Sequence, residues 1–383
     1  MPAPLDGLTV LDFSPLLPGP FATRVLADLG ARVIRIESPS RPDLVRHTPP
    51  FVGGVSAAHA YLNRNKRNLA LDLKAPGAVE AVLALVDGAD VLVEQFRPGV
   101  MARLGLGYAA LAARNPRLVY CSISGYGQDG PLRDRAGHDN GYQALSGLAA
   151  ASGRADGGPP PLGFQPADLA GSLHAVIGIL AALRQRDRDG QGQQLDIALA
   201  DCAFHFNALA GCAALAGEDT APEGHLLNGG SHYDHYRTRD GRWLAVGSLE
   251  PPFLATLCAA IGLPELAGRF GREPEQAKAI LAARLLEEDF AHWRTVFAAV
   301  DACVEPVLTP AEAAASELAA ARGWKVDVPA GDAVLGQPAL PIRFSRAEPV
   351  YAQAGGGLGA DGAAILREAG LDEAAIERLL RPA

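Results

Sequence analysis

Residues 8–36 read LTVLDFSPLLPGPFATRVLADLGARVIRI, and the order of patterns in this stretch predicts the class of fold. The apolar run 8–13 is rich in strand formers, the Ser- and Pro-rich residues 14–20 break it, and residues 21–29 have a helical pattern. Residues 30–36 supply a second strand. Together these segments predict a βαβ unit, whose crossover should be right-handed.

The same alternation continues along the chain. We expect further strands at 68–73, 90–94, 118–123 and 193–198, and helices at about 77–86 and 169–184. Alternating strands and helices predict an α/β fold with a doubly wound parallel sheet. Ligands of such sheets bind beyond the carboxyl ends of the strands, where the loops after Phe13, Glu94 and Ile123 should lie.

The length of 383 residues predicts two domains, because it exceeds what one hydrophobic core usually serves. Periodicity is lost at 213–231, strand character with a turn at Asp240-Gly241 follows, helices then dominate to about 321, and a last helix is expected near 362–380. We therefore predict a large domain at 1–200, a linker at 201–230, a smaller α+β domain at 231–325, and a segment at 326–383 that returns to the large domain.

Composition excludes several classes of function. A net charge of -9 argues against nucleic-acid binding, which needs clustered cations. We expect no membrane span, since no apolar run of about 18 residues is visible, and a cytoplasmic location, since the start lacks a signal-peptide pattern. The five cysteines form no CxxC pair, and His232 and His235 lack further ligands at zinc-site spacing, so we expect no metal.

Three polar clusters framed by Gly or Pro are candidates for chemistry. In AGHDNGY at 136–142, His138 could shuttle protons near neutral pH, or it could lie on the surface while Asp139 caps a helix. In GFQPADLAG at 163–171, Asp168 could cap the following helix and also act as an ionised carboxylate. In VGSLEPPF at 246–253, Glu250 precedes Pro251 at the start of a helix, which is a capping position.

Basic candidates for a phosphorylated cofactor are the segment NRNKR at 63–67, Lys74, Arg97 and Arg103. Arginine matches phosphate geometry with its planar fork, and lysine acts as a point charge. The chain has no GxGxxG after the first strand and no GxxxxGK[ST], so neither a dinucleotide fingerprint nor a P-loop is present.

Taken together, these segments resemble the superfamily of family III CoA-transferases and 2-methylacyl-CoA racemases, also known as the carnitine dehydratase and bile-acid-inducible type. The resemblance runs through nearly the whole chain. It rests on PLDGL at 4–8, LDF at 11–13, PGP at 18–20, LGA at 29–31, VIRIE at 33–37, NKR at 65–67, RPG at 97–99, GYG at 125–127, GHD at 137–139 and GSLEP at 247–251.

The resemblance implies a Rossmann-like large domain and a homodimer whose two chains are intertwined. It also implies coenzyme A in the large domain, as part of an acyl-CoA substrate, without a metal or a nicotinamide. The implied cofactor-binding residues are Leu16, Leu17, Leu71, Lys74, Arg97, Arg103 and Tyr142. Some members have an arginine where this chain has Ser38, so a phosphate contact there must come from another residue, such as Arg41.

The family divides by chemistry, and its catalytic positions match Asp168, His138, Glu250 and Asp139. In racemases the matching His and Asp exchange a proton at the α-carbon of the thioester, and the matching Glu pairs with the Asp. In transferases the matching Asp attacks the thioester carbonyl, giving an anhydride and then an aspartyl-CoA thioester.

All three racemase positions are filled, which favours racemase-like epimerisation. The segment before Asp168 and its Ala167 differ from typical racemases, which keeps a CoA-transferase acting on a carboxylic acid as the alternative. A non-catalytic acyl-CoA binding protein is a third hypothesis, but it has no need for these residues.

Overall fold

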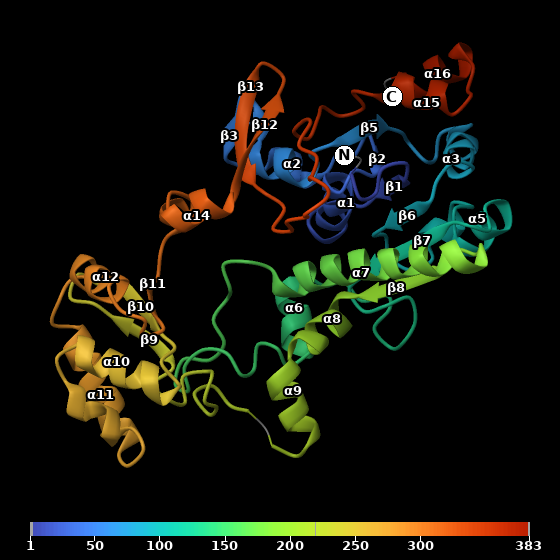
Figure 1. Cartoon of the computed structure of the whole chain (residues 1–383). Coiled ribbons are helices and arrows are strands. Elements are labelled where there is room, and N and C mark those ends of the chain that lie inside the picture. The colour runs from blue at the N-terminus through green and yellow to red at the C-terminus, as the bar shows by residue number, and fades with distance from the viewer. Residues whose placement is uncertain (1–2, 219, 382–383) are drawn as a thin grey trace. The chain divides into compact units, whose positions relative to one another are not determined.

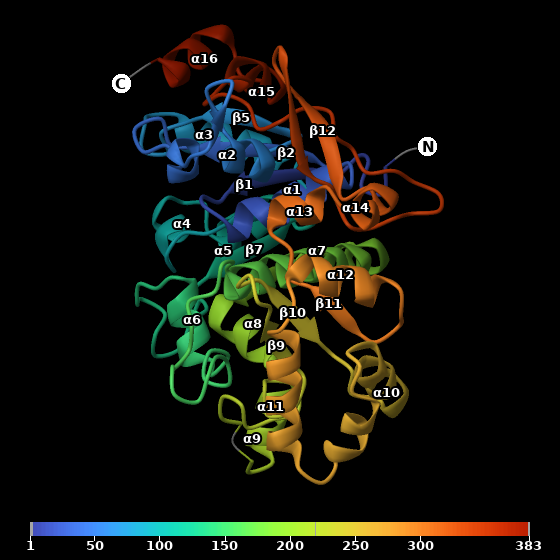
Figure 2. The ribbon, with the colours of Figure 1, turned by 90° about the vertical axis from the view of Figure 1, so that its left-hand side faces the viewer.

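The computed structural model describes residues 3–218 and 220–381, which form two compact units. Of the described residues, the first unit comprises 3–145, 164–206 and 317–381, and the second comprises 146–163, 207–218 and 220–316. The chain therefore passes between the units several times (Figures 1 and 2). The domain boundaries given above stay a prediction, but helices occupy part of the expected linker, because residues 199–215 are rich in the helix formers Ala and Leu.

A six-stranded parallel sheet forms the centre of the first unit, which confirms the predicted α/β class. Its order is β5-β2-β1-β6-β7-β8, and all neighbouring strands are parallel. The strands are β1 Thr9–Phe13, β2 Arg32–Glu37, β5 Lys66–Ala70, β6 Val91–Glu94, β7 Val119–Ser124 and β8 Gln194–Ala198. The strand order reverses between β1 and β6, so a topological switch point lies at their carboxyl ends.

Helices cover this sheet and supply its core. They are α1 Pro18–Asp28, α2 Ala57–Leu62, α3 Ala78–Val86, α4 Val100–Arg103, α5 Tyr108–Arg114, α6 Asp139–Leu145, α7 Pro166–Asp189, α8 Leu199–Phe206, α14 Glu317–Arg322, α15 Gly362–Glu368, α16 Glu373–Leu380 and the 3-10 helix η1 Leu44–His47. Two hairpins complete the unit, β3 Phe51–Val52 with β4 Val55–Ser56, and β12 Lys325–Ala330 with β13 Ala333–Pro338. The C-terminal helices α15 and α16 add Ile365 and Leu379 to the core that Leu11 and Leu92 form on the sheet.

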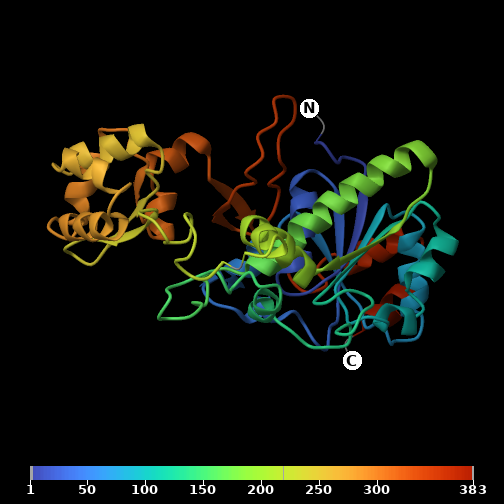
Figure 3. The ribbon, with the colours of Figure 1, turned by 90° about the horizontal axis from the view of Figure 1, so that it is seen from below.

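Helix α7 runs along the sheet and packs against α1, α8, β7 and β8 (Figure 3). By length and composition it could cross a membrane, which corrects the expectation that no such apolar run exists. Small and polar residues such as Gly171 and His174 interrupt the run and obscure it in the sequence. Half of its apolar window is buried in the unit, as is typical of the core helix of a globular domain.

The basic segment 63–67 is structural, and its interpretation as a phosphate contact is wrong. Lys66 is fully buried and pairs with Asp12 at 2.9 Å, and Arg64 pairs with Asp28 at 2.6 Å. Arg67 pairs with the side-chain carboxylate of Glu368 on α15 at 2.7 Å. Buried charges such as those of Arg64 and Lys66 are retained only when they are paired, and the more exposed Arg67 is occupied by Glu368, so these cations are not free for a ligand.

The second unit contains an antiparallel sheet of order β11-β10-β9 with helices packed on it. Its elements are α9 Ala208–Leu215, β9 Asp234–Arg237, β10 Trp243–Val246, α10 Pro251–Ala260, η2 Pro264–Arg269, α11 Pro274–Leu285, α12 Phe290–Ala298, β11 Val304–Pro306 and α13 Pro310–Ala314. The core surrounds Trp293, whose indole N–H donates to the carbonyl of Leu285 at 2.8 Å. The predicted turn at Asp240-Gly241 joins β9 to β10.

Candidate active site

A pocket of about 760 Å³ opens at the carboxyl ends of β1, β2, β5 and β6. Its walls are residues 13–16 after β1, 35–38 and 41–44 at the end of β2 and beyond, 71–74 after β5, and 96–97, 100 and 103–104 after β6. All of these residues belong to the first unit. The pocket therefore lies at the switch point of the sheet, where doubly wound folds bind their ligands.

Four cations line this pocket without a carboxylate partner among the residues that the structure describes. They are Arg41, Lys74, Arg97 and Arg103, and all four are exposed. By contrast, the buried Arg35 in the same lining is paired with Asp43 at 2.6 Å and with Glu37 at 3.3 Å. The positive charge of these four side chains is therefore not neutralised by the protein. Arginine and lysine side chains gathered in this way suit a ligand with several phosphate groups.

Most of the predicted cofactor contacts lie in this lining: Leu16, Leu71, Lys74, Arg97 and Arg103. Leu17 is not among the lining residues. It precedes α1, and its carbonyl accepts the N–H of Phe21 at 2.9 Å. Tyr142 is on α6, also outside this lining. Arg41 lines the pocket together with Ser38 and supplies a cation three residues after it.

Two residues near this pocket were not singled out from the sequence. Phe96 forms part of the wall. Glu94 at the end of β6 is only 4% exposed and accepts the N–H of Phe96 at 2.9 Å. Burial raises the pKa of the Glu94 carboxyl to about 7. An acidic residue that ends an otherwise apolar strand is the signal that could have revealed it.

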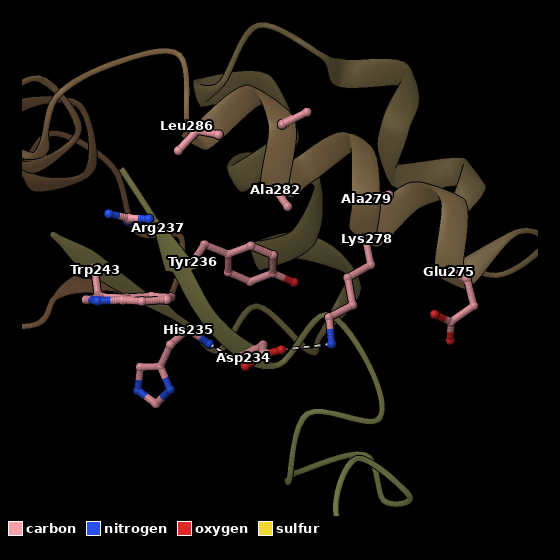
Figure 4. A pocket seen from close by; sticks show the side chains of 11 residues that line it. Asp234, His235, Tyr236, Arg237, Trp243, Glu275, Lys278, Ala279, Ala282 and Leu286 are labelled. Atoms are coloured by element: carbon pink, nitrogen blue, oxygen red, sulfur yellow. Dashed lines mark hydrogen bonds and ion pairs between the residues drawn. The ribbon is translucent and has the colours of Figure 1, made fainter. Parts of the chain in front are cut away.

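A second pocket of about 550 Å³ lies between β9 and α11 of the second unit (Figure 4). Its Lys278 is paired with Asp234 at 2.8 Å, and the same carboxylate binds Arg154 at 2.7 Å. The positive charge around Asp234 is therefore neutralised. This pocket suits a polyanion less well than the pocket at the switch point.

Asp168 and Asp139 meet at the start of α7, although 29 residues separate them in the sequence. The Asp139 carboxylate accepts the backbone N–H of Asp168 at 3.0 Å through Oδ1, and the amide of Gln143 at 2.5 Å through Oδ2. Helix α7 begins at Pro166 with Gln165 as its N-cap, so the predicted capping role of Asp168 is wrong. The helix starts earlier because proline suits the first helical turn.

The carboxyl of Asp168 is half-buried, and its oxygens make no hydrogen bond to any residue that the structure describes. Burial, and then the negative charge of Asp139, raises its pKa to about 7. Burial disfavours the charged form of an acid, and a nearby like charge adds to that effect. Carboxyl groups with such perturbed pKa values are candidates for acid–base chemistry.

His138 directly precedes α6 and is exposed, and its carbonyl accepts the N–H groups of Gly141 and Tyr142 at 2.9 and 3.2 Å. Tyr142 stacks edge-on against Tyr126 at 5.2 Å between ring centroids. A Cβ atom at Gly137 would lie 2.6 Å from Cε1 of Tyr142, so only glycine fits there. The Gly-His-Asp motif therefore combines close packing at Gly137 with a carboxylate, Asp139, that accepts the backbone N–H of Asp168.

Glu250 is in the second unit, at the N-cap of α10, as the sequence predicts. It is exposed, and its side chain makes no capping hydrogen bond. No group of three His, Cys, Asp or Glu side chains suited to a metal is found within residues 3–218 and 220–381. His232 instead bonds the carbonyl of Ser248 at 2.9 Å.

The fold and its pocket thus define an α/β protein with a cation-lined pocket at the switch point of a parallel sheet. The sequence model of the protein family described as "CoA-transferase family III" matches residues 5–362 of this chain. The acetyl-CoA:oxalate CoA-transferase of Acetobacter aceti is 37% identical, over 97% of each chain. The alpha-methylacyl-CoA racemase of Homo sapiens is 39% identical, over 80% of this chain and 78% of its own. The crystal structure of a CAIB/BAIF family protein from Brucella suis aligns with a TM-score of 0.85 at 32% identity, over 96% of this chain and 100% of that one.

The chain belongs to CoA-transferase family III. This confirms the resemblance stated from the sequence motifs. It also confirms that the protein is an enzyme, because the relatives named above are enzymes. The hypothesis of a non-catalytic binding protein is therefore set aside, and the relatives include both transferases and racemases.

Proposed function

We propose that the switch-point pocket binds the coenzyme A part of an acyl-CoA substrate. Lys74, Arg97 and Arg103 would contact its phosphate groups, and Leu16 and Leu71 would contact its apolar surfaces. The support is the unneutralised positive charge of the lining beside these apolar walls. A pocket lined by both cationic and apolar side chains suits a ligand that carries both phosphates and an aromatic base.

We propose racemase-like proton exchange at the α-carbon of the bound thioester as the reaction. Asp168 and His138 would exchange the proton, and the charge of Asp139 would keep the pKa of Asp168 high. Glu250 would pair with Asp168, a role that rests on the family resemblance alone. The observation that carries this proposal is the half-buried carboxyl of Asp168 next to Asp139, a setting that raises the pKa of Asp168 to about 7. A carboxyl with a pKa near the working pH can both accept and return a proton.

CoA transfer is the second candidate. Here the ionised Asp168 attacks the thioester carbonyl and displaces the CoA thiolate, which attacks the aspartyl carbonyl of the resulting anhydride and releases the donor acid. The acceptor carboxylate then displaces CoA from the aspartyl-CoA thioester, and the CoA attacks the acceptor carbonyl of this second anhydride, which releases Asp168. The match to the acetyl-CoA:oxalate CoA-transferase over 97% of both chains favours this candidate, since the match to the racemase covers 80% of this chain.

The deciding experiment incubates the protein in deuterated water with a 2-methylacyl-CoA and no acceptor acid, and follows deuterium at the α-carbon by mass spectrometry. Racemase-like chemistry predicts exchange. Exchange should fall by roughly 100-fold or more in both His138→Ala and Asp168→Ala. Asp187→Asn is the matched control, because Asp187 is exposed near the other end of α7.

Absence of exchange in the wild type would reject the racemase proposal. If a carboxylic acid then moves the CoA, and hydroxylamine traps an adduct on Asp168, transfer is the reaction. Asp168→Ala should abolish transfer, whereas His138→Ala should spare most of it. Equal loss of transfer in both variants would contradict this assignment of roles.

We also propose that the protein forms a homodimer. Leu173 and Ile177 of α7 are 44% and 62% exposed, and Phe204 and Phe206 of α8 are 50% and 46% exposed. The two helices lie against each other, because the ring of His174 packs against that of Phe206 at 5.8 Å. An apolar face of this kind favours burial against a second copy. Intertwining of the chains and a cytoplasmic location stay predictions.

A further inference from the structure

A buried carboxylate, Asp43, connects two walls of the switch-point pocket. Its side chain is only 1% exposed, so it is shielded from solvent although its residue belongs to the pocket lining. Oδ2 accepts the backbone N–H of Leu16 at 3.1 Å and the guanidinium of Arg35 at 2.6 Å. Oδ1 accepts the N–H of Val45 at 3.1 Å and thereby begins η1.

The contact with Leu16 matters because of the backbone conformation there. Leu16 has φ +63°, in the left-handed region that residues other than glycine seldom adopt. It lies in the loop between β1 and α1, and it lines the pocket. A single hydrogen bond from its N–H to a buried carboxylate holds this loop to the segment after β2.

Further hydrogen bonds and one ion pair hold Asp43 in place. Its backbone N–H donates to Oε1 of Glu37 at 2.7 Å, and Arg46 binds both oxygens of Glu37 at 2.9 Å. Arg46 also donates to the carbonyl of Gly356 at 3.1 Å, in the C-terminal segment. The segment 38–42, which carries Arg41, is thus held at both ends by one buried network.

We infer that Asp43 is a positioning residue for coenzyme A. It holds Leu16 in its left-handed conformation, and together with Arg35 it fixes the segment that presents Arg41. This inference rests on the proposed binding of CoA in the same pocket. Asp43 thus determines the shape of two pocket walls, although its own carboxylate is already bound within the protein and is not free to contact the ligand.

The test measures CoA binding by calorimetry, and KM and kcat for an acyl-CoA, in the wild type and in Asp43→Asn. The amide keeps the size of the side chain, but it loses the charge that binds Arg35 and that strengthens the hydrogen bond from the N–H of Leu16. We expect the dissociation constant for CoA and the KM to rise about tenfold, since a charged hydrogen bond is lost. We expect kcat to stay within about twofold. Asp87→Asn is the matched control, because Asp87 is paired only at an exposed site with Arg114.

A second variant separates positioning of Leu16 from general destabilisation. Glycine adopts positive φ without a carboxylate to hold it. In a Leu16→Gly background, Asp43→Asn should therefore raise the dissociation constant by less than about threefold. Failure of the wild type to bind CoA would overturn the proposed function. CoA binding in the wild type with equal affinity in Asp43→Asn, or the same loss in both backgrounds, would overturn the role of Asp43 alone.

Discussion

Replacing Asp168 by asparagine should abolish activity and yet stabilise the protein at alkaline pH. The folded protein raises the pKa of this carboxyl from 3.8 to about 7. Between these values the native state holds a proton that the unfolded chain releases, so stability falls as pH rises through this window. The penalty is complete above the folded pKa and disappears below the unfolded one.

The size of the effect follows from the shift. About 3 pH units at 1.36 kcal/mol each give a ceiling of roughly 4 kcal/mol. Solvent contact at the half-buried carboxyl lowers this ceiling, so we expect Asp168→Asn to gain roughly 2–4 kcal/mol at pH 8. The gain should be about 40% as large at pH 5, because this pH is little more than one unit above the pKa of the carboxyl in the unfolded chain.

Equilibrium unfolding in urea at pH 5 and pH 8 measures this difference. The control Asp187→Asn removes the same charge from an exposed site of α7 and should change stability by less than about 0.5 kcal/mol at either pH. A carbon-13 NMR titration of the Asp168 carboxyl provides the pKa directly. An equal gain at both pH values, or a titration midpoint near 4, would refute the reasoning.

Three further predictions concern the pocket, the carboxylate pair and the core. Arg97→Ala should weaken CoA binding by about 1.5–3 kcal/mol in calorimetry, because a charged phosphate contact is lost, and unchanged affinity would exclude this contact. Asp139→Asn should move the pH–rate limb of Asp168 to lower pH, because the like charge is removed, and an unmoved limb would contradict the coupling. Lys66→Met should cost about 3–5 kcal/mol in urea unfolding, because Asp12 is left buried and unpaired. Adding Asp12→Asn should recover much of that loss, and no recovery would show that the ion pair is not its source.

The candidate site shows where local patterns were sufficient. Lys74 and Arg97 follow shortly after strands β5 and β6, Arg103 ends the short helix α4 that comes after β6, and all three line one pocket. Parallel strands bring their carboxyl ends to one edge, so residues in these loops gather there whatever the details of packing. The family motifs point to the same loops.

The basic segment 63–67 shows where local patterns failed. Lys66 and Lys74 are both lysines at or near an end of β5. Lys66 is nevertheless fully buried against Asp12, whereas Lys74 is exposed in the pocket. The partner of Lys66 lies 54 residues away. Pairing and burial depend on such distant neighbours, and no local pattern contains them.

The periodicity of the chain was enough to predict the alternation of strands and helices, because hydrophobic spacing is a local property that each segment carries alone. The acidity of Asp168 was decided only when the chain folded. Asp139 reaches it from another helix, and the surrounding atoms remove the water that would stabilise its charge. Desolvation and charge proximity are properties of the assembled structure, so the chemical state of this carboxyl could not be predicted from its neighbours in the sequence.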